Sequence, residues 1–150
     1  MTIFIKSQII KVKFGKKTKV IEPVNLYHCK IGDDCLIGPF VEIQANVSLG
    51  KKNKVQSHSF ICSNVKILDN CFIGHGVMFV NDRFENGKPS GKKKLRKTLI
   101  GNNVSIGSNT TILPITICDN VVIGAGSVVT KNILKSGIYA GNPAKFIRKV

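Results

Sequence analysis

The apolar residues of the chain recur at intervals of six. Nine of them follow one another at this spacing without exception: Ile31, Ile37, Ile43, Leu49, Val55, Ile61, Ile67, Ile73 and Phe79. The interval resumes in two further sets, separated by a one-residue slip at Pro114: Ile100, Ile106 and Ile112, then Ile117, Ile123 and Val129. A period of six fits neither an α-helix nor an alternating strand, but it fits a β-helix in which each hexad forms one side of a triangular coil. The pattern therefore predicts an all-β fold, a parallel β-helix of hexapeptide repeats.

The fifth position of each early hexad predicts a second inward side chain. It is occupied mostly by small residues: Cys35, Val41, Val47, Asn53, Ser59, Val65, Cys71 and Val77. Cys29 joins this set if the register is extended back by one hexad, and a thiol there acts as a small apolar filler. At about eighteen residues a coil, the two runs predict roughly five to six coils in a single domain spanning residues 1–150.

Two segments fall outside the repeat. Residues 1–24 are expected to form an N-terminal cap, because Ile10, Val12 and Phe14 alternate with lysines as in a half-buried strand that could cover the first coil. Residues 84–98 are expected to form one inserted loop, since their start is rich in Gly, Pro, Asn and Ser. An insertion on one corner of a solenoid is typical of a binding element.

The register predicts which polar residues are neighbours, because residues eighteen apart stack in successive coils. The predicted stacked pairs are Ser57 with His75, His58 with Gly76, Ser63 with Asn81, and Asn64 with Asp82. We therefore expect His58, His75, Asn81 and Asp82 to cluster around one corner beside the inserted loop. Glu42 and Gln44 are expected one coil below. This polar group is the candidate site.

The formal net charge of +15 favours an anionic partner. Lysines crowd residues 11–19 and 88–97, but no aromatic residue interrupts the run Lys92 to Lys97, so nucleic acid is not expected and phosphates on small ligands are favoured. No apolar stretch approaches the ~20 residues of a membrane span, and no signal peptide is evident at Met1. Five cysteines, an odd number, favour a reducing compartment. A cytoplasmic protein without a membrane partner is predicted.

Four sequence blocks carry a family resemblance: residues 38–44 (GPFVEIQ), 57–62 (SHSFIC), 72–82 (FIGHGVMFVND) and 140–145 (AGNPAK). Together they resemble the left-handed β-helix N-acetyltransferases that act on nucleotide-linked amino sugars in bacterial surface-polysaccharide pathways. The resemblance spans residues 24–148. It implies a left-handed coil, a homotrimer, and acetyl-CoA as co-substrate, with acetyl-CoA and sugar meeting in the groove between neighbouring subunits.

The resemblance also implies roles for individual residues. Asn81 lies where the amino-sugar branch places an asparagine that holds the sugar amine, whereas related acyltransferases place a histidine there. His75 and His58 keep a general-base route open. The candidate residues for binding the acceptor are Glu42, Gln44, Asp82 and Arg83. The candidates for binding the cofactor are Ala125, Gly126 and Ala140 along the pantetheine arm, and Lys145, Arg148 and Lys131 for the phosphates of coenzyme A.

The expected function is acetyl transfer from acetyl-CoA to the amino group of a dTDP- or UDP-linked amino sugar, with a 3-amino-3,6-dideoxyhexose favoured. An O-acetyltransferase acting on a sugar or serine hydroxyl is the nearest alternative. A metal enzyme like the γ-class carbonic anhydrases is not expected, because only His28, His58 and His75 offer imidazoles and the close histidine pair of that class is absent. A non-catalytic solenoid, as a scaffold or a nucleic-acid binder, leaves the polar group unexplained.

Overall fold

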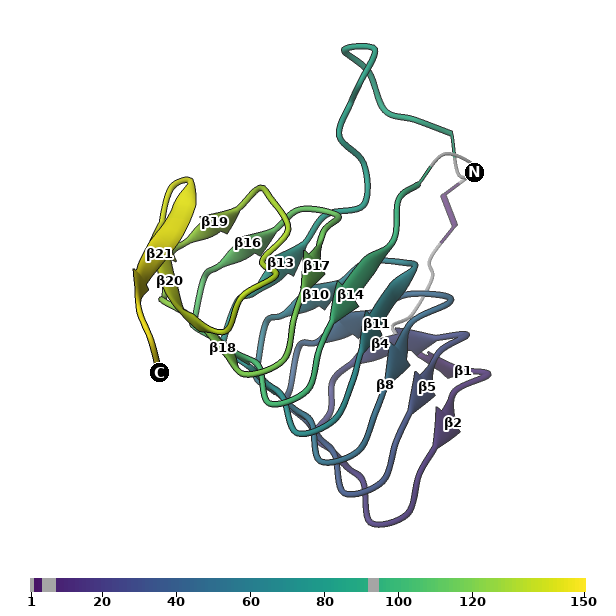
Figure 1. The fold of residues 1–150 in the computed structure, drawn as a ribbon. Coiled ribbons are helices and arrows are strands. Elements are labelled where there is room, and N and C mark those ends of the chain that lie inside the picture. The colour runs from purple at the N-terminus through teal and green to yellow at the C-terminus, as the bar shows by residue number, and fades with distance from the viewer. Residues whose placement is uncertain (1, 4–7, 92–94) are drawn as a thin grey trace.

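A computed structural model describes residues 2–3, 8–91 and 95–150. It shows a solenoid of short strands that stack into three parallel sheets, with the N-terminal and C-terminal coils at opposite ends (Figure 1). The described residues contain strands, turns and bends but no helix, and so nothing of the length and apolarity that a membrane-spanning helix needs. The coil is the left-handed β-helix that the resemblance implies.

The three sheets are named A, B and C. Sheet A, with 7 strands, contains β1 (Ile9–Ile10), β4 (Asn25–Tyr27), β7 (Glu42–Ile43), β10 (Phe60–Ile61), β13 (Met78–Phe79), β16 (Thr111–Ile112) and β19 (Val128–Val129). Sheet B, with 6 strands, contains β2 (Lys13–Phe14), β5 (Lys30–Ile31), β8 (Ser48–Leu49), β11 (Val65–Ile67), β14 (Thr98–Ile100) and β17 (Thr116–Ile117). Sheet C, with 8 strands, contains β3 (Lys19–Val20), β6 (Leu36–Ile37), β9 (Lys54–Val55), β12 (Phe72–Ile73), β15 (Ser105–Ile106), β18 (Val121–Ile123), β20 (Gly137–Gly141) and β21 (Ala144–Arg148).

The core is one column of aliphatic side chains inside the triangle. The second residue of most two-residue strands points inward, and Ile37, Ile43, Ile61 and Ile73 are fully buried at 0% exposure. The second inward position is buried as well, Cys29, Cys35 and Cys71 among them. Burying one such isoleucine contributes about 1.5–3 kcal/mol, and truncating it to alanine costs about 2–5 kcal/mol. The predicted two inward residues per hexad are confirmed.

Each coil turns at three corners, which we name by the side chains that line them. The histidine corner, between sheets C and A, comprises residues 39–40, 57–58, 75–76, 108–109 and 125–126. The asparagine corner, between sheets A and B, comprises residues 27–28, 45–46, 63–64 and 81–82. The aspartate corner, between sheets B and C, comprises residues 16–17, 33–34, 51–52, 69–70, 102–103 and 119–120. The second residue of these turns has positive φ at every position but Asp82, and asparagine and glycine tolerate this conformation best.

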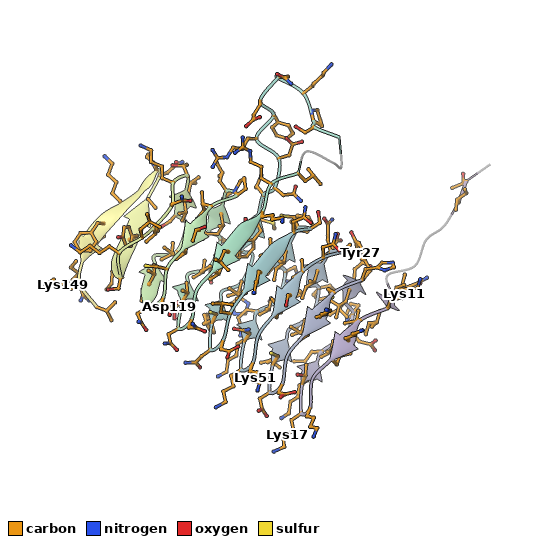
Figure 2. All side chains as sticks on the ribbon, turned by 45° about the vertical axis from the view of Figure 1, so that its right-hand side comes forward. Lys11, Lys17, Tyr27, Lys51, Asp119 and Lys149 are labelled. Carbon is orange, nitrogen blue, oxygen red and sulfur yellow. The ribbon has the colours of Figure 1, made fainter. Side chains whose placement is uncertain are left out.

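The aspartate corner shows how side chains tie one coil to the next. The carboxylate of Asp69 accepts a hydrogen bond from the backbone N–H of Lys51 at 2.8 Å, and Asp119 accepts one from Asn102 at 2.7 Å. The backbone N–H of Asn102, and then its side-chain amide, hold the pKa of the Asp119 carboxyl below its usual value. Figure 2 shows Lys17, Lys51 and Asp119 along this edge of the solenoid. The side chains of this corner hold neighbouring coils together, and the sequence predicted no functional site there.

The N-terminal segment departs from the single alternating strand expected at residues 10–14. Two strands, β1 and β2, stand there instead, separated by a corner at Lys11 with φ 49°, and they pair in parallel with β4 and β5. With β3 they complete a further coil, whose inward residues are Ile9, Phe14 and Val20, because these pair with the buried Leu26, Ile31 and Ile37. Ile9 and Phe14 remain partly exposed, at 43% and 42%, because no coil among the described residues lies below them.

One-residue slips account for the coil that the period of six missed. Ile9 pairs with Leu26 and Lys13 with Lys30, a separation of 17 residues, whereas the following coils repeat every 18. Leu26 to Ile31 is a step of five, so counting back by six from Ile31 lands on polar residues. The slip expected at Pro114 is confirmed, since Ser105 pairs with Val122.

The inserted loop leaves the asparagine corner after β13 and returns to β14 (Figure 1). Val65 pairs with Thr98, 33 residues away instead of 18, so fifteen residues are inserted, as the spacing from Phe79 to Ile100 predicts. At the C-terminal end, β20 extends sheet C in parallel and β21 folds back on it antiparallel.

Candidate functional site

The histidine corner carries two exposed imidazoles in adjacent coils. The predicted stack of Ser57 and His75 is present, because Ser57 Oγ lies 2.8 Å from His75 Nδ1. The ring of His58 stacks on Phe40 one coil below, with centroids 4.9 Å apart. Gly76 lies above His58 with φ 64°, in the register predicted. Both histidines therefore project from the same edge of the solenoid.

The asparagine corner holds a chain of side-chain hydrogen bonds. Asn81 Nδ2 donates to the carbonyl oxygen of Ser63 at 3.2 Å and to its Oγ at 2.9 Å, so the predicted stack is present. The backbone N–H of Ser63 donates to Gln44 Oε1 at 3.2 Å, and Gln44 Nε2 donates to Glu42 Oε1 at 3.0 Å. Asn25 Nδ2 donates to the other oxygen of Glu42 at 3.1 Å. The chain fixes Asn81, Gln44 and Glu42 in one arrangement.

These two groups do not form the single cluster that the register suggested. The histidines follow strands of sheet C, whereas Asn81 follows β13 of sheet A, so the whole outer face of sheet A separates them. At about 3.3 Å per residue, the five residues from Gly76 to Asn81 span roughly 15–17 Å. Within one chain, the prediction of four polar residues around one corner is corrected to two corners that flank one face.

Asp82 and Arg83 organise the inserted loop. Asp82 Oδ1 accepts a hydrogen bond from Phe84 N at 2.9 Å and Oδ2 accepts one from Ser90 N at 2.6 Å. These backbone N–H groups hold the pKa of the Asp82 carboxyl below its usual value. Arg83 Nη2 donates to the carbonyl oxygen of Pro114 at 3.2 Å. Asp82 does not stack on Asn64 as predicted, because the chain leaves the coil at this point.

The returning arm of the loop is hydrogen-bonded to the asparagine corner. Thr98 N donates to the Asn64 carbonyl oxygen at 3.2 Å, in the place predicted for Asp82, and Arg96 N donates to the Asn81 carbonyl oxygen at 2.9 Å. Arg96 also forms an ion pair with Glu85. The loop is thus tied at its base to the residue proposed to hold the acceptor.

Two adjoining cavities lie beside this corner. The first, of about 370 Å³, is lined by Tyr27, Gln44, Ala45, Asn46, Ser63, Asn64 and Leu95. The second, of about 580 Å³, is lined by Asn46, Ser48, Asn64, Val65, Lys66, Lys97, Thr98, Leu99 and Thr116. They share Asn46 and Asn64, and we call the two together the groove. Gln44 and Ser63 of the hydrogen-bonded network line its first cavity.

The cofactor candidates divide between the corners. Ala125 and Gly126 lie in the histidine corner, two coils from His75, and a Cβ added at Gly126 would meet open space. Ala140 packs its Cβ against Gly124 and pairs with Lys145 across β20 and β21.

The phosphate candidates are not all neighbours. Lys145 lies beside Ala140, near the histidine corner, and Arg148 pairs with Ile138 at the other end of the hairpin. Lys131 follows β19, on the side of sheet A that faces sheet B. Lys92, Lys93 and Lys94, the centre of the basic run, lie outside the described residues. Among the residues described, no group of three His, Cys, Asp or Glu side chains could hold a metal ion.

Two residues of this network were missed in the sequence: Asn25, which donates to Glu42, and Tyr27, which lies beside Glu42. Ser63 was predicted as the partner of Asn81 but not as a site residue. Burial raises the pKa of the Tyr27 phenol, and the charge of Glu42 and a hydrogen bond to it act in the same direction. The phenol therefore stays protonated at neutral pH. A register that included the 17-residue step would have placed Asn25 below Glu42.

Two models of hexapeptide repeats match the chain. Residues 28–63 match the bacterial transferase hexapeptide (six repeats), and residues 97–131 match the hexapeptide repeat of succinyl-transferase. A "putative acetyltransferase" of Saccharomyces cerevisiae is 35% identical over 150 residues, covering 97% of this chain and 71% of that protein. The chain belongs to the hexapeptide-repeat transferase family. The predicted hexapeptide-repeat family is confirmed, and its amino-sugar branch stays a prediction.

Other relatives are longer. The bifunctional protein GlmU of Streptococcus uberis is 32% identical over 94% of this chain, yet the chain spans only 32% of its length. It spans 21% of GlmU from Clostridium botulinum strain ATCC 19397.

Solved structures of the family share the fold. A hexapeptide transferase family protein from Anaplasma phagocytophilum superposes with a TM-score of 0.78 at 19% identity, covering 93% of this chain and 79% of that one. A maltose O-acetyltransferase from Clostridium difficile gives 0.67 at 27% identity, covering 95% and 71%. A mutant perosamine N-acetyltransferase from Caulobacter crescentus, in complex with CoA and GDP-perosamine, gives 0.64 at 16% identity, covering 94% and 57%.

Proposed function

We propose that the chain transfers an acetyl group from acetyl-CoA to the amino group of a dTDP- or UDP-linked amino sugar, with a 3-amino-3,6-dideoxyhexose as the favoured acceptor. The observation that carries the proposal is the orientation of Asn81. Its Nδ2 donates to two oxygens of Ser63, which directs Oδ1 away from them as an acceptor for an amine N–H. The adjoining cavity of about 370 Å³ offers room for a sugar.

The proposed reaction mainly requires that the acceptor amine be oriented toward the thioester carbonyl. A neutral amine is a good nucleophile, and holding it against the thioester carbonyl supplies much of the acceleration. The new C–N bond replaces the C–S bond, and the amine proton leaves with the sulfur. Glu42 adds a negative charge that attracts the acceptor in its ammonium form, and its hydrogen bonds from Asn25 and Gln44 keep it in place. The ammonium gives its extra proton to solvent water, and Asn81 then orients the neutral amine.

The histidine corner suits an extended cofactor arm. Its upper coils carry small residues, Ser108, Ala125 and Gly126, above His75. At about 4.8 Å per coil, the two coils from His75 to Ala125 span roughly 10 Å. In the proposal the pantetheine arm lies along this edge, with Ala140 beside it and Lys145, Arg148 and Lys131 as candidates for the phosphates.

The proposal includes a homotrimer in which the acceptor corner of one subunit meets the cofactor corner of its neighbour. Exposed apolar side chains near sheet A support such contacts, including Phe40 at 57% and Met78 at 42% exposure. We place the reaction in the cytoplasm, in surface-polysaccharide biosynthesis, where nucleotide-linked sugars are used. Sedimentation should give a species of three 16.4 kDa chains, and a stable monomer at micromolar concentration would remove the shared groove.

A second candidate is O-acetylation of a sugar hydroxyl. It is favoured by the 27% identity to the maltose O-acetyltransferase, higher than that to the perosamine enzyme, and by the exposed His75. When Nδ1 donates its proton to Ser57 Oγ, Nε2 is free to take a proton from a hydroxyl. A hydroxyl acceptor requires that proton removal.

One experiment separates the two candidates. Thiol release from acetyl-CoA is measured against dTDP-, UDP- and GDP-linked amino sugars and against maltose, galactosides and serine. We expect release above the hydrolysis rate only with nucleotide-linked amino sugars. Release with the hydroxyl acceptors alone would replace the proposal by the second candidate. No release with any acceptor would remove both.

A further inference from the structure

The outer face of sheet B is basic and carries no balancing carboxylate. Its outward residues, in the order of the strands, are Lys13, Lys30, Ser48, Lys66, Leu99 and Thr116. None of the six described strands of this sheet contains an aspartate or glutamate. An anion at this face therefore meets attraction from several lysines and no nearby repulsion from the strands.

The face is hollowed where the inserted loop returns. The cavity of about 580 Å³ is lined by Lys66 from β11 and by Lys97, which immediately precedes β14. Ser48, one strand from Lys66, adds a hydroxyl, and Asn46 and Asn64 add side-chain amides. Ammonium, hydroxyl and amide N–H groups donate hydrogen bonds to phosphate oxygens.

The position of this cavity relative to Asn81 indicates which class of anionic ligand would fit it. It shares Asn46 and Asn64 with the 370 Å³ cavity, whose lining includes Ser63, the hydrogen-bond partner of Asn81. A ligand with its charged part between Lys66 and Lys97 would extend an uncharged ring toward Asn81. Nucleotide-linked sugars have this order of groups.

We propose that the cavity lined by Lys66 and Lys97 binds the diphosphate of a nucleoside diphosphate and so positions the attached sugar with its amine at Asn81. The inference rests on the proposed function for the identity of the sugar. Neither lysine is among the residues that the sequence indicated for binding the acceptor, and both lie outside the four blocks that carried the resemblance. Coenzyme A also carries phosphates, and its binding at the same lysines is the competing outcome.

The test measures direct binding and turnover in parallel. Calorimetric titration of dTDP and UDP is carried out on the full chain and on three variants: K66A/K97A, K66R/K97R and K54A. Lys54 serves as the matched control, because it is exposed on sheet C between Leu36 and Phe72, away from the groove. Thermal unfolding of each variant checks that the exposed substitutions leave the fold intact.

We expect K66A/K97A to raise the dissociation constant for both nucleotides on the order of 10- to 100-fold, with weaker binding at high salt in the unmodified chain. K66R/K97R should retain most of the affinity and K54A all of it. In turnover, the Michaelis constant for the nucleotide-linked sugar should rise by a similar factor, kcat should change less than about twofold, and the constant for acetyl-CoA should stay unchanged.

The outcomes separate this inference from the proposed function. Lysine-dependent binding of dTDP or UDP without acetylation of any nucleotide-linked sugar would support the groove and remove the proposed reaction. Acetylation of such a sugar with unchanged constants in K66A/K97A would overturn the groove alone. A rise in the constant for acetyl-CoA instead of the sugar would assign the lysines to the co-substrate and also overturn the inference.

Discussion

The histidine corner and the asparagine corner flank sheet A and are built from the same six-residue repeat. They differ in how firmly contacts within the chain hold their side chains. The histidine corner is open, since His58 and His75 are exposed and each makes one side-chain contact with the coil below. At the asparagine corner, hydrogen bonds link Asn81 through Ser63 to Gln44, and the returning end of the inserted loop bonds to the carbonyl oxygens of Asn64 and Asn81. An open edge suits a long ligand, whereas a fixed, partly enclosed amide suits one polar group of a small ligand.

The largest test of this difference is Asn81→Ala. If the fixed corner orients the amine, kcat should fall on the order of 100-fold, because misplacing a reactant by about 1 Å costs that much. His75→Ala and His58→Ala should each lower kcat less than about tenfold. The measurement is steady-state thiol release by variants whose sedimentation and circular dichroism match the unmodified chain. A hundredfold loss in a histidine variant with Asn81→Ala nearly normal would exchange the roles of the corners.

Two substitutions, Gly76→Ala and Gly126→Ala, test how much free space the histidine corner has. Gly76 and Gly126 have φ 64° and 68°, so alanine costs about 1–2 kcal/mol of unfolding free energy at either position. A Cβ at Gly76 also meets Asn109 Oδ1, whereas one at Gly126 meets nothing within 4 Å. Displacing the Asn109 rotamer adds about 0.5–1.5 kcal/mol. Chemical denaturation should therefore rank Gly76→Ala as the less stable variant, and equal stabilities would contradict the contact.

A smaller effect is expected from Ser63→Ala. It removes the hydroxyl that Asn81 Nδ2 reaches at 2.9 Å but leaves the backbone carbonyl at 3.2 Å, so Asn81 keeps one of its two acceptors. We expect kcat to fall about 3- to 10-fold, in line with the ~1 kcal/mol of a single hydrogen bond. Ser105→Ala, on the outer face of sheet C, is the matched control. A loss as large as that of Asn81→Ala would mean that the hydroxyl itself touches the acceptor.

The smallest expected effect probes whether the asparagine corner stays closed. Cys62 lies just before Ser63 and is 2% exposed, and burial raises the pKa of its thiol to about 12. At pH 8 the thiolate fraction is then about one in ten thousand, since each unit below the pKa lowers it tenfold. Alkylation of native protein, followed by peptide mass analysis, should leave Cys62 unmodified and label it only after denaturation. Rapid labelling at pH 8 would show that the corner opens.

Much of the fold could be predicted because each side of the coil is a local unit. The alternation of inward and outward side chains needs only a few residues, so the anchors from Ile31 to Phe79, the slip at Pro114 and the fifteen-residue insertion were readable in the sequence. The N-terminal coil was not. The single step of five between Leu26 and Ile31 shifts the period, and only pairing between strands reveals that Phe14 and Val20 continue the column.

The sequence predicted which residues of the candidate site stack on one another, but not how the stacked pairs are arranged in space. The stacking of Ser57 with His75 and of Ser63 with Asn81 followed from counting eighteen residues, and both contacts are present. That the two pairs lie at different corners depends on which sheets they connect. The role of Asp82 in the loop could not be read either, because its hydrogen bonds to Phe84 and Ser90 form only within the folded insertion.

The sequence by itself determined the repeat, the class of fold and the family, since all three rest on short-range spacing and local blocks of residues. Only the tertiary structure decided that Glu42, Gln44, Ser63 and Asn81 form one chain of hydrogen bonds, and that Lys66 and Lys97 face one groove. The physical reason is that a hydrogen bond or a cavity depends on the positions of side chains from different coils. The distance between coils is set by strand pairing across 17, 18 or 33 residues, which no single hexad specifies.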